Sequence, residues 1–248
     1  MTKKLLLSAI LVAYGIPVLA QATAKGVAEN NLRMANFIHA MSTKEQALVA
    51  DRTLNLSDIE GSMYYVEAFI PGQIYYSDKA FKTIPMRYNA YTDEIEIKRD
   101  DQETAEALLK DSKVSCEVNG ERLVYSEYLD KKGNLENGYL VKIFAGQKYN
   151  LYEKRSKTFK EGQQPKTSLH LPTPDKFVGK SEFYLTADSE TPKFLPDSKK
   201  KLSTVFDADK IGVLKTFIKK NDIDLSKKED LQRLLGYAET VTAEGKGV

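Results

Sequence analysis

Tryptophan is absent from this 248-residue chain, which also has only one cysteine and two histidines. With the single thiol of Cys116, no intramolecular disulfide can form, and a chain of this length buries enough apolar surface to fold without one. Neither His39 nor His170 has a second ligand at the short spacing of zinc motifs. A serine triad would also have to use one of them, and no Gly-x-Ser-x-Gly motif is present. The composition therefore excludes a disulfide scaffold and does not support zinc or triad chemistry.

Long apolar runs are missing beyond the first twenty residues, so we expect no transmembrane segment in the mature chain. The N-terminus itself has the three parts of a cleavable export signal. Lys3 and Lys4 precede an apolar run over residues 5–13, and small residues precede a predicted cut after Ala20. A cut after Ala24 is the alternative. We therefore expect an exported protein.

The positive formal charge of the chain belongs to this predicted signal. Removing Lys3 and Lys4 lowers the 37 basic residues to 35, which equals the number of acidic residues. A nucleic-acid partner, which binds through an excess of basic residues, is therefore not expected. No cysteine lies near the cut, so we expect no lipid anchor. The product should be a soluble periplasmic or extracellular protein.

Residues 58–159 show the alternating apolar pattern of β-strands and many of the 14 tyrosines. Asn119-Gly120, between residues 114–118 and 122–128, is the strongest hairpin signal. The other predicted hairpins join residues 63–70 to 73–76 through Pro71-Gly72, 84–88 to 94–98, and 139–144 to 148–152. We predict a mainly β, α+β fold whose core is an antiparallel sheet, sandwich or partly open barrel.

The flanking segments complete the predicted organisation. A signal peptide (1–20) and an N-terminal helical or irregular segment (21–57) precede the β core (58–159). An extended, proline-containing arm (160–181) follows it. Residues 182–239 hold a final strand (182–186) and two amphipathic helices, the second beginning at the capping box Ser226-Lys227-Lys228-Glu229. Residues 240–248 are a flexible tail.

Asp93, Glu94 and Glu96 are the strongest acidic candidates for catalysis. Glu94 and Glu96 share one face of a predicted strand, so each can perturb the pKa of the other. A glycosidase needs two carboxylates about 5–10 Å apart in a cleft. A solvated strand face, with Lys98 and Arg99 beside it, explains the same pattern without catalysis.

Three other motifs resemble functional sites but have simpler explanations. Cys116 lies on the apolar side of its strand, as expected of a buried, inert thiol. Gly179-Lys180-Ser181 ends like a phosphate-binding loop, but the first glycine of that motif falls at Pro174. The segment 222–226 opens like a calcium loop, but the required glycine and glutamate are Lys227 and Arg233. We therefore predict no catalytic, cofactor-binding or metal-binding residue.

Several blocks resemble an uncharacterised exported family of Bacteroidota. They are Gly61-Ser62-Met63-Tyr64 with Phe69 and Gly72, residues 86–97 beginning Met86-Arg87-Tyr88-Asn89-Ala90-Tyr91, and the lysine-rich segments 199–206 and 217–234. The resemblance covers residues 58–239 and departs at Met63, where the family pattern has proline. It implies a Gram-negative envelope and brings no known reaction, cofactor or site residue.

These observations favour a non-enzymatic envelope protein that binds a partner or ligand. The alternative is a periplasmic carrier that holds a small apolar ligand in a half-open β-barrel. A hydrolase that uses Asp93, Glu94 or Glu96 is the third hypothesis. The carrier requires a deep apolar cavity, and the hydrolase requires a cleft beside two of these carboxylates.

Overall fold

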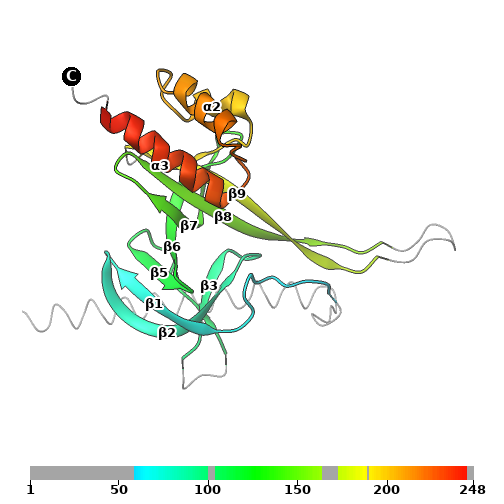
Figure 1. The fold of residues 1–248 in the computed structure, drawn as a ribbon. Coiled ribbons are helices and arrows are strands. Elements are labelled where there is room, and N and C mark those ends of the chain that lie inside the picture. Colours follow the sequence, from blue (N-terminus) through cyan, green and yellow to red (C-terminus); the bar gives the residue numbers. More distant parts are fainter. Residues whose placement is uncertain (1–58, 100–103, 164–172, 189, 245–248) are drawn as a thin grey trace, which may run out of the picture. The chain divides into compact units, whose positions relative to one another are not determined.

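A computed structural model describes residues 59–99, 104–163, 173–188 and 190–244 of the chain (Figure 1). The chain divides into two compact units, residues 1–47 and 48–248, and every described residue belongs to the second. The predicted signal peptide (1–20) and N-terminal helical segment (21–57) lie outside the described residues. So do His39 and His170.

The described strands form one ten-stranded sheet in the order β10-β9-β8-β7-β6-β5-β1-β2-β3-β4. Neighbouring strands pair antiparallel, and β10 also pairs in parallel with β6. The strands are β1 (Ile70–Tyr76), β2 (Lys79–Asn89), β3 (Glu94–Ile97), β4 (Glu106–Ala107), β5 (Val114–Val118), β6 (Glu121–Leu129), β7 (Leu135–Ala145), β8 (Tyr149–Lys160), β9 (Lys176–Ala187) and β10 (Lys193–Phe194). The end strands of this described sheet, β10 and β4, do not pair with each other, so it is not a closed barrel. The predicted mainly β fold with an antiparallel sheet is confirmed.

Three of the predicted hairpins are present. β2 and β3, β5 and β6, and β7 and β8 are adjacent antiparallel pairs. Asn119 and Gly120 join β5 to β6 with φ values of 53° and 74°, the left-handed backbone of a type I′ turn. Local turn signals therefore identified these pairs correctly.

The first predicted hairpin is wrong. Pro71 and Gly72 lie inside β1, where Pro71 is opposite Pro85. A Cβ atom on Gly72 would lie 2.6 Å from Met86 Sδ and 2.9 Å from the Glu117 carbonyl oxygen. The glycine is thus required for close packing of β1 between β2 and β5, not for a turn. The real turn follows at residues 77–78.

Both ends of the predicted arm (160–181) belong to a β-hairpin, since Lys160 ends β8 and residues 176–181 begin β9. β8 and β9 pair over twelve residues on each strand, from Tyr149↔Ala187 to Lys160↔Lys176. The strand predicted over 182–186 is therefore β9, which begins at Lys176. Figure 1 shows this pair as a long twisted ribbon that extends past the other strands. Its polar side chains hid it from the apolar pattern, because partner-strand hydrogen bonds form with any side chain.

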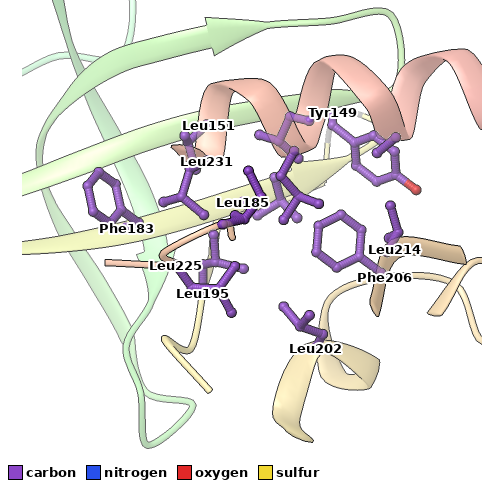
Figure 2. Packing of buried hydrophobic residues seen from close by; sticks show 14 of the residues in the cluster. Tyr149, Leu151, Phe183, Leu185, Leu195, Leu202, Phe206, Leu214, Leu225 and Leu231 are labelled. Atoms are coloured by element: carbon purple, nitrogen blue, oxygen red, sulfur yellow. The ribbon is translucent and has the colours of Figure 1, made fainter. Parts of the chain in front are cut away.

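Two helices end the described chain, as predicted, and cover the sheet. They are α2 (Ile211–Lys220) and α3 (Lys228–Glu244), preceded by the 3₁₀ helix η2 (Lys199–Thr204). α3 packs against β7 and β8. Figure 2 shows Leu214 and Leu231 of these helices facing Tyr149 and Leu185 of the sheet in one apolar cluster. The predicted tail is wrong for residues 240–244, which continue α3.

A second apolar cluster fills the curved half of the sheet, which consists of β1, β2, β3 and β5 with parts of β6 and β7. It includes Met86, Ile95 and Cys116, which have no exposed surface, and Tyr139, which is 2% exposed. Side chains from β1, β2, β3, β5, β6 and β7 contribute to it. This part of the sheet is therefore a packed core and not an empty barrel.

Glu239 of α3 fastens the helix to the β7–β8 turn. Its carboxylate accepts hydrogen bonds from the backbone N–H groups of Lys148 (3.0 Å) and Tyr149 (2.7 Å). Glu239→Ala leaves the two donors without this acceptor, so we expect the free energy of unfolding to fall by about 2–4 kcal/mol. Urea unfolding measures the change. Glu229→Ala, at an exposed position of α3, should cost at most about 1 kcal/mol, and equal losses would contradict the fastening role.

Candidate functional site

The three acidic residues of the hydrolase hypothesis each have a basic partner. Two of the ion pairs are close contacts and the third is longer. The pairs are Asp93–Lys154 at 2.6 Å, Glu96–Arg87 at 2.7 Å and Glu94–Lys110 at 3.7 Å. The carboxylates are thus divided among three separate cations.

The predicted solvated face of β3 is wrong for Glu96, which is 8% exposed. Residues 61–69, here named the strap, precede β1, and Tyr64 of the strap contacts Glu96 with its hydroxyl group (3.1 Å). Asn89 also donates to Glu96 (2.9 Å). The Arg87 guanidinium lies 3.8 Å from the Tyr64 ring centroid and 4.2 Å from that of Phe69. Glu96 is therefore a buried acceptor that fastens the strap to the sheet.

Asp93 occupies a fork where β8 separates from β7. The β7–β8 pairing ends at Val141 and Glu153. Beyond that point the β2–β3 turn approaches β8, and Lys157 N–H donates to the Ala90 carbonyl oxygen (2.9 Å). The fork is defined here as this separation of β7 and β8 together with turn residues 90–93.

Tyr139 pairs with β6 but not with β8 inside the fork. On the β8 side, Asp93 and Lys154 bind its backbone N–H and carbonyl groups instead. Tyr139 N–H donates to Asp93 Oδ2 (3.2 Å), and Lys154 Nζ donates to the Tyr139 carbonyl oxygen (3.3 Å). The Tyr88 hydroxyl donates to Asp93 Oδ1 (2.7 Å). A Cβ atom on Gly138 would lie 2.5 Å from Asp93 Oδ2, so a glycine is required beside the pair.

Burial shifts the pKa values of Lys154 and Tyr88, which both contact Asp93. It lowers the pKa of Lys154, although Asp93 opposes that change, and it raises the pKa of Tyr88 well above its usual value. All of the close contacts of Asp93 are with groups that hold β2, β7 and β8 together. We therefore interpret Asp93 as a structural residue.

The other sequence motifs are also structural in the described residues. Cys116 is completely buried, as predicted, and burial raises the pKa of its thiol to about 12. Residues 179–181 lie within strand β9, where a phosphate-binding loop would need a helix. No group of three or more His, Cys, Asp or Glu side chains in the described chain is placed to hold a metal ion.

The loop before α3 is stabilised differently from the prediction. Asp224 accepts hydrogen bonds from the backbone N–H (3.0 Å) and hydroxyl (2.7 Å) of Ser226. Asp230 accepts one from the Asp224 N–H (3.1 Å). Ser226 is therefore not the N-cap residue of α3, because the helix begins two positions later at Lys228 and the Ser226 hydroxyl donates to Asp224.

A polar cleft of about 550 Å³ lies beside strands β6 and β7. Residues 110–112, before β5, form one wall, and residues 190–192, between β9 and β10, form another. β6 and β7 contribute Tyr125, Glu127 and Asn137. This volume lies within the range of about 300–1,000 Å³ that is usual for small-molecule sites.

Glu127 and Asn137 are the most available groups of this cleft. They are directly opposite each other in the β6–β7 pairing, and both are exposed. Neither side chain forms a hydrogen bond or ion pair with another described residue. In contrast, Lys110 pairs with Glu94, and Glu190 pairs with Lys193. A carboxylate and an amide are thus free to bind a ligand beside the Tyr125 ring.

An apolar groove under the strap is much smaller, about 50 Å³. Tyr65 and Val66 of the strap line it together with Met86 and Leu123 of the sheet. Tyr65 and Val66 are 40% and 45% exposed. This groove has room for one small apolar group, and a drug-sized or lipid ligand requires several times more.

Comparison with known protein families, curated protein sequences and solved structures gives no match for this chain. No helix in the described part of the chain is long and apolar enough to cross a membrane. The cleft residues were not identified from the sequence. They come from four separate segments between residues 110 and 192, and a carboxylate next to an amide has no characteristic spacing.

Proposed function

We propose that this is an exported envelope protein that binds a small, hydroxyl-rich ligand in the polar cleft without altering it chemically. The observation that carries the proposal is the free pair of Glu127 and Asn137 within a cleft of about 550 Å³. A carboxylate accepts hydrogen bonds from hydroxyl groups, and an amide both donates and accepts. The Tyr125 ring adds an apolar surface for carbon atoms.

Charge narrows the ligand class further. Asp111, Glu127 and Glu190 line the cleft with one basic residue, Lys110. An anionic ligand would meet an excess of negative charge, so a neutral or amine-bearing sugar fits better than a sugar phosphate. The catalytic alternative lacks support because Asp93, Glu94 and Glu96 are held in separate ion pairs.

Export and location belong to the same proposal. Lys3, Lys4 and the apolar run up to the cut at Ala20 support export, and the resemblance to the Bacteroidota family supports a Gram-negative envelope. We propose a periplasmic or extracellular location without a lipid anchor. An apolar-ligand carrier is less well supported, since the curved half of the sheet is filled by buried side chains.

A partner protein is the second candidate ligand. The strap groove supports it, because Tyr65 and Val66 expose apolar surface beside a recess of about 50 Å³. Such a recess accepts one apolar side chain of a partner, which is typical of a small anchor site. The charged residues Arg87, Glu121 and Arg155 also line this recess.

Calorimetric titration of the mature protein with glucose, glucosamine, N-acetylglucosamine and glucose 6-phosphate tests the cleft. We expect at least one uncharged or amine-bearing sugar to bind, and the phosphate to bind at least about ten-fold more weakly because of repulsion. Glu127→Ala combined with Asn137→Ala should weaken sugar binding at least about ten-fold, because each lost hydrogen bond contributes about 1 kcal/mol or more.

Glu136→Ala is the matched control. Glu136 precedes Asn137 in β7, is exposed and is directed to the opposite face of the strand. Sugar affinity should be unchanged in this variant. The ligand class is wrong if none of the sugars binds, and the site is wrong if the double variant binds as tightly as the parent protein.

A further inference from the structure

The tip of the β1–β2 hairpin exposes two aromatic rings. Phe81 is 75% exposed and Tyr76 is 51% exposed. Every residue from 76 to 83 is exposed, so the tip lies outside the apolar clusters of the described chain. Phe81 is the most exposed large apolar residue in the described part of the chain. Its ring is therefore accessible to another molecule.

Phe81 lies in a β-bulge. Tyr75 is opposite Ala80, and Ile74 is opposite Lys82, so Phe81 is the additional residue between them. A bulge leaves its extra residue unpaired and changes the direction of its side chain. Ile74 remains in the core while Phe81 lies in solvent.

The tip contacts the segment before β5 and strand β6. Ser77 N–H donates to the Lys113 carbonyl oxygen (2.8 Å), and Asp78 pairs with Arg122 (3.0 Å). Arg122 in turn stacks on Tyr75, with 3.8 Å between its guanidinium carbon and the ring centroid. The backbone hydrogen bond limits the movement of the turn and so reduces the conformational entropy that the tip loses on binding.

Positive charge surrounds the exposed rings. Lys79, Lys82 and Lys113 are exposed, and none of them forms an ion pair with a described residue. Asp78, the acidic residue of the turn, is already paired with Arg122. Aromatic rings favour the boundary between lipid headgroups and acyl chains, and lysines are attracted to anionic headgroups.

We propose that this hairpin tip docks the protein on an anionic lipid surface, with Phe81 inserted at the headgroup boundary and Lys79, Lys82 and Lys113 on the lipid phosphates. Two features of the hairpin tip support this proposal: its exposed aromatic rings, and three nearby lysines that form no ion pair with a described residue. It is independent of the ligand proposed for the cleft.

Phe81→Trp provides a direct probe, because the chain has no other tryptophan. The experiment adds the mature variant to vesicles of phosphatidylcholine alone or mixed with an equal amount of phosphatidylglycerol. We expect a blue shift of tryptophan fluorescence, and quenching by brominated acyl chains, with the mixed vesicles only. An unchanged spectrum with the mixed vesicles overturns the proposal.

Sedimentation of the protein with the same vesicles separates insertion from simple adsorption. Phe81→Ser, and separately Lys79→Ser with Lys82→Ser, should each lower the bound fraction at least about five-fold. Leu135→Ser is the control, since Leu135 is 56% exposed at the start of β7, in another hairpin. Equal losses in Leu135→Ser, or binding that does not require Phe81, would overturn the docking mode.

Discussion

Asp93→Asn is expected to lower the free energy of unfolding by about 3–5 kcal/mol. The substitution removes the charge that pairs at 2.6 Å with Lys154, whose side chain is 11% exposed, and thus leaves a cation in the fork without its counter-charge. Asparagine tolerates the left-handed backbone of this position (φ 57°), so backbone strain does not contribute. Urea unfolding followed by circular dichroism measures the loss.

Asp78→Asn is a closely matched control for this prediction. Asp78 also has a left-handed backbone (φ 62°) and a basic partner, but its side chain is 96% exposed. Its ion pair with Arg122 should contribute less than about 1 kcal/mol. A double variant, Asp93→Asn with Lys154→Met, should recover part of the loss, because it removes the unpaired charge. Similar effects of Asp93→Asn and Asp78→Asn would show that the fork is not a structural centre.

Tyr139→Phe and Tyr88→Phe are expected to change stability in opposite directions. The Tyr139 hydroxyl is buried without a hydrogen-bond partner among the described residues. Removing it should raise the free energy of unfolding by about 1–2 kcal/mol, which is the cost of an unsatisfied polar group. The Tyr88 hydroxyl donates to Asp93 at 2.7 Å and also lies 2.9 Å from the Arg155 carbonyl oxygen. Its loss should lower that free energy by about 1.5–3 kcal/mol.

The two tyrosines form their own control. Their rings belong to the same apolar cluster and lie edge to face, with 6.3 Å between the centroids. Each substitution removes one hydroxyl group and keeps the ring, so packing is nearly constant. Thermal and urea unfolding of both variants compares the signs directly. Destabilisation by Tyr139→Phe would mean that its hydroxyl group has a partner.

Local sequence signals predicted those parts of the fold whose partners are near in the chain. Asn119-Gly120 identified the β5–β6 hairpin because its left-handed turn matches the twist of the two strands. The amphipathic spacing of Leu214 and Ile218 likewise identified α2. Pro71-Gly72 misled the prediction, because that glycine accommodates a close packing contact with Met86 that is invisible in the sequence.

Among the candidate site residues, the sequence predicted the surroundings of some correctly and those of others wrongly. Cys116 was correctly placed in the core from the alternation of its strand. Glu96 alternates in the same way, yet its face is covered by the strap, which reaches it from 32 positions away through Tyr64. Alternation tells which residues share a face, but it does not tell what covers that face. For the same reason the cleft beside Glu127 and Asn137 could not be predicted.

The sequence alone determined the mainly β fold, three of the hairpins, the two C-terminal helices and the buried thiol. These features depend on the period of apolar residues and on turn chemistry within about ten residues. Only the tertiary structure decided the pairing of β1 with β5, the fork around Asp93 and the polar cleft. Each of them joins segments that are distant in the chain, and such contacts depend on how complete strands pack together rather than on any local pattern.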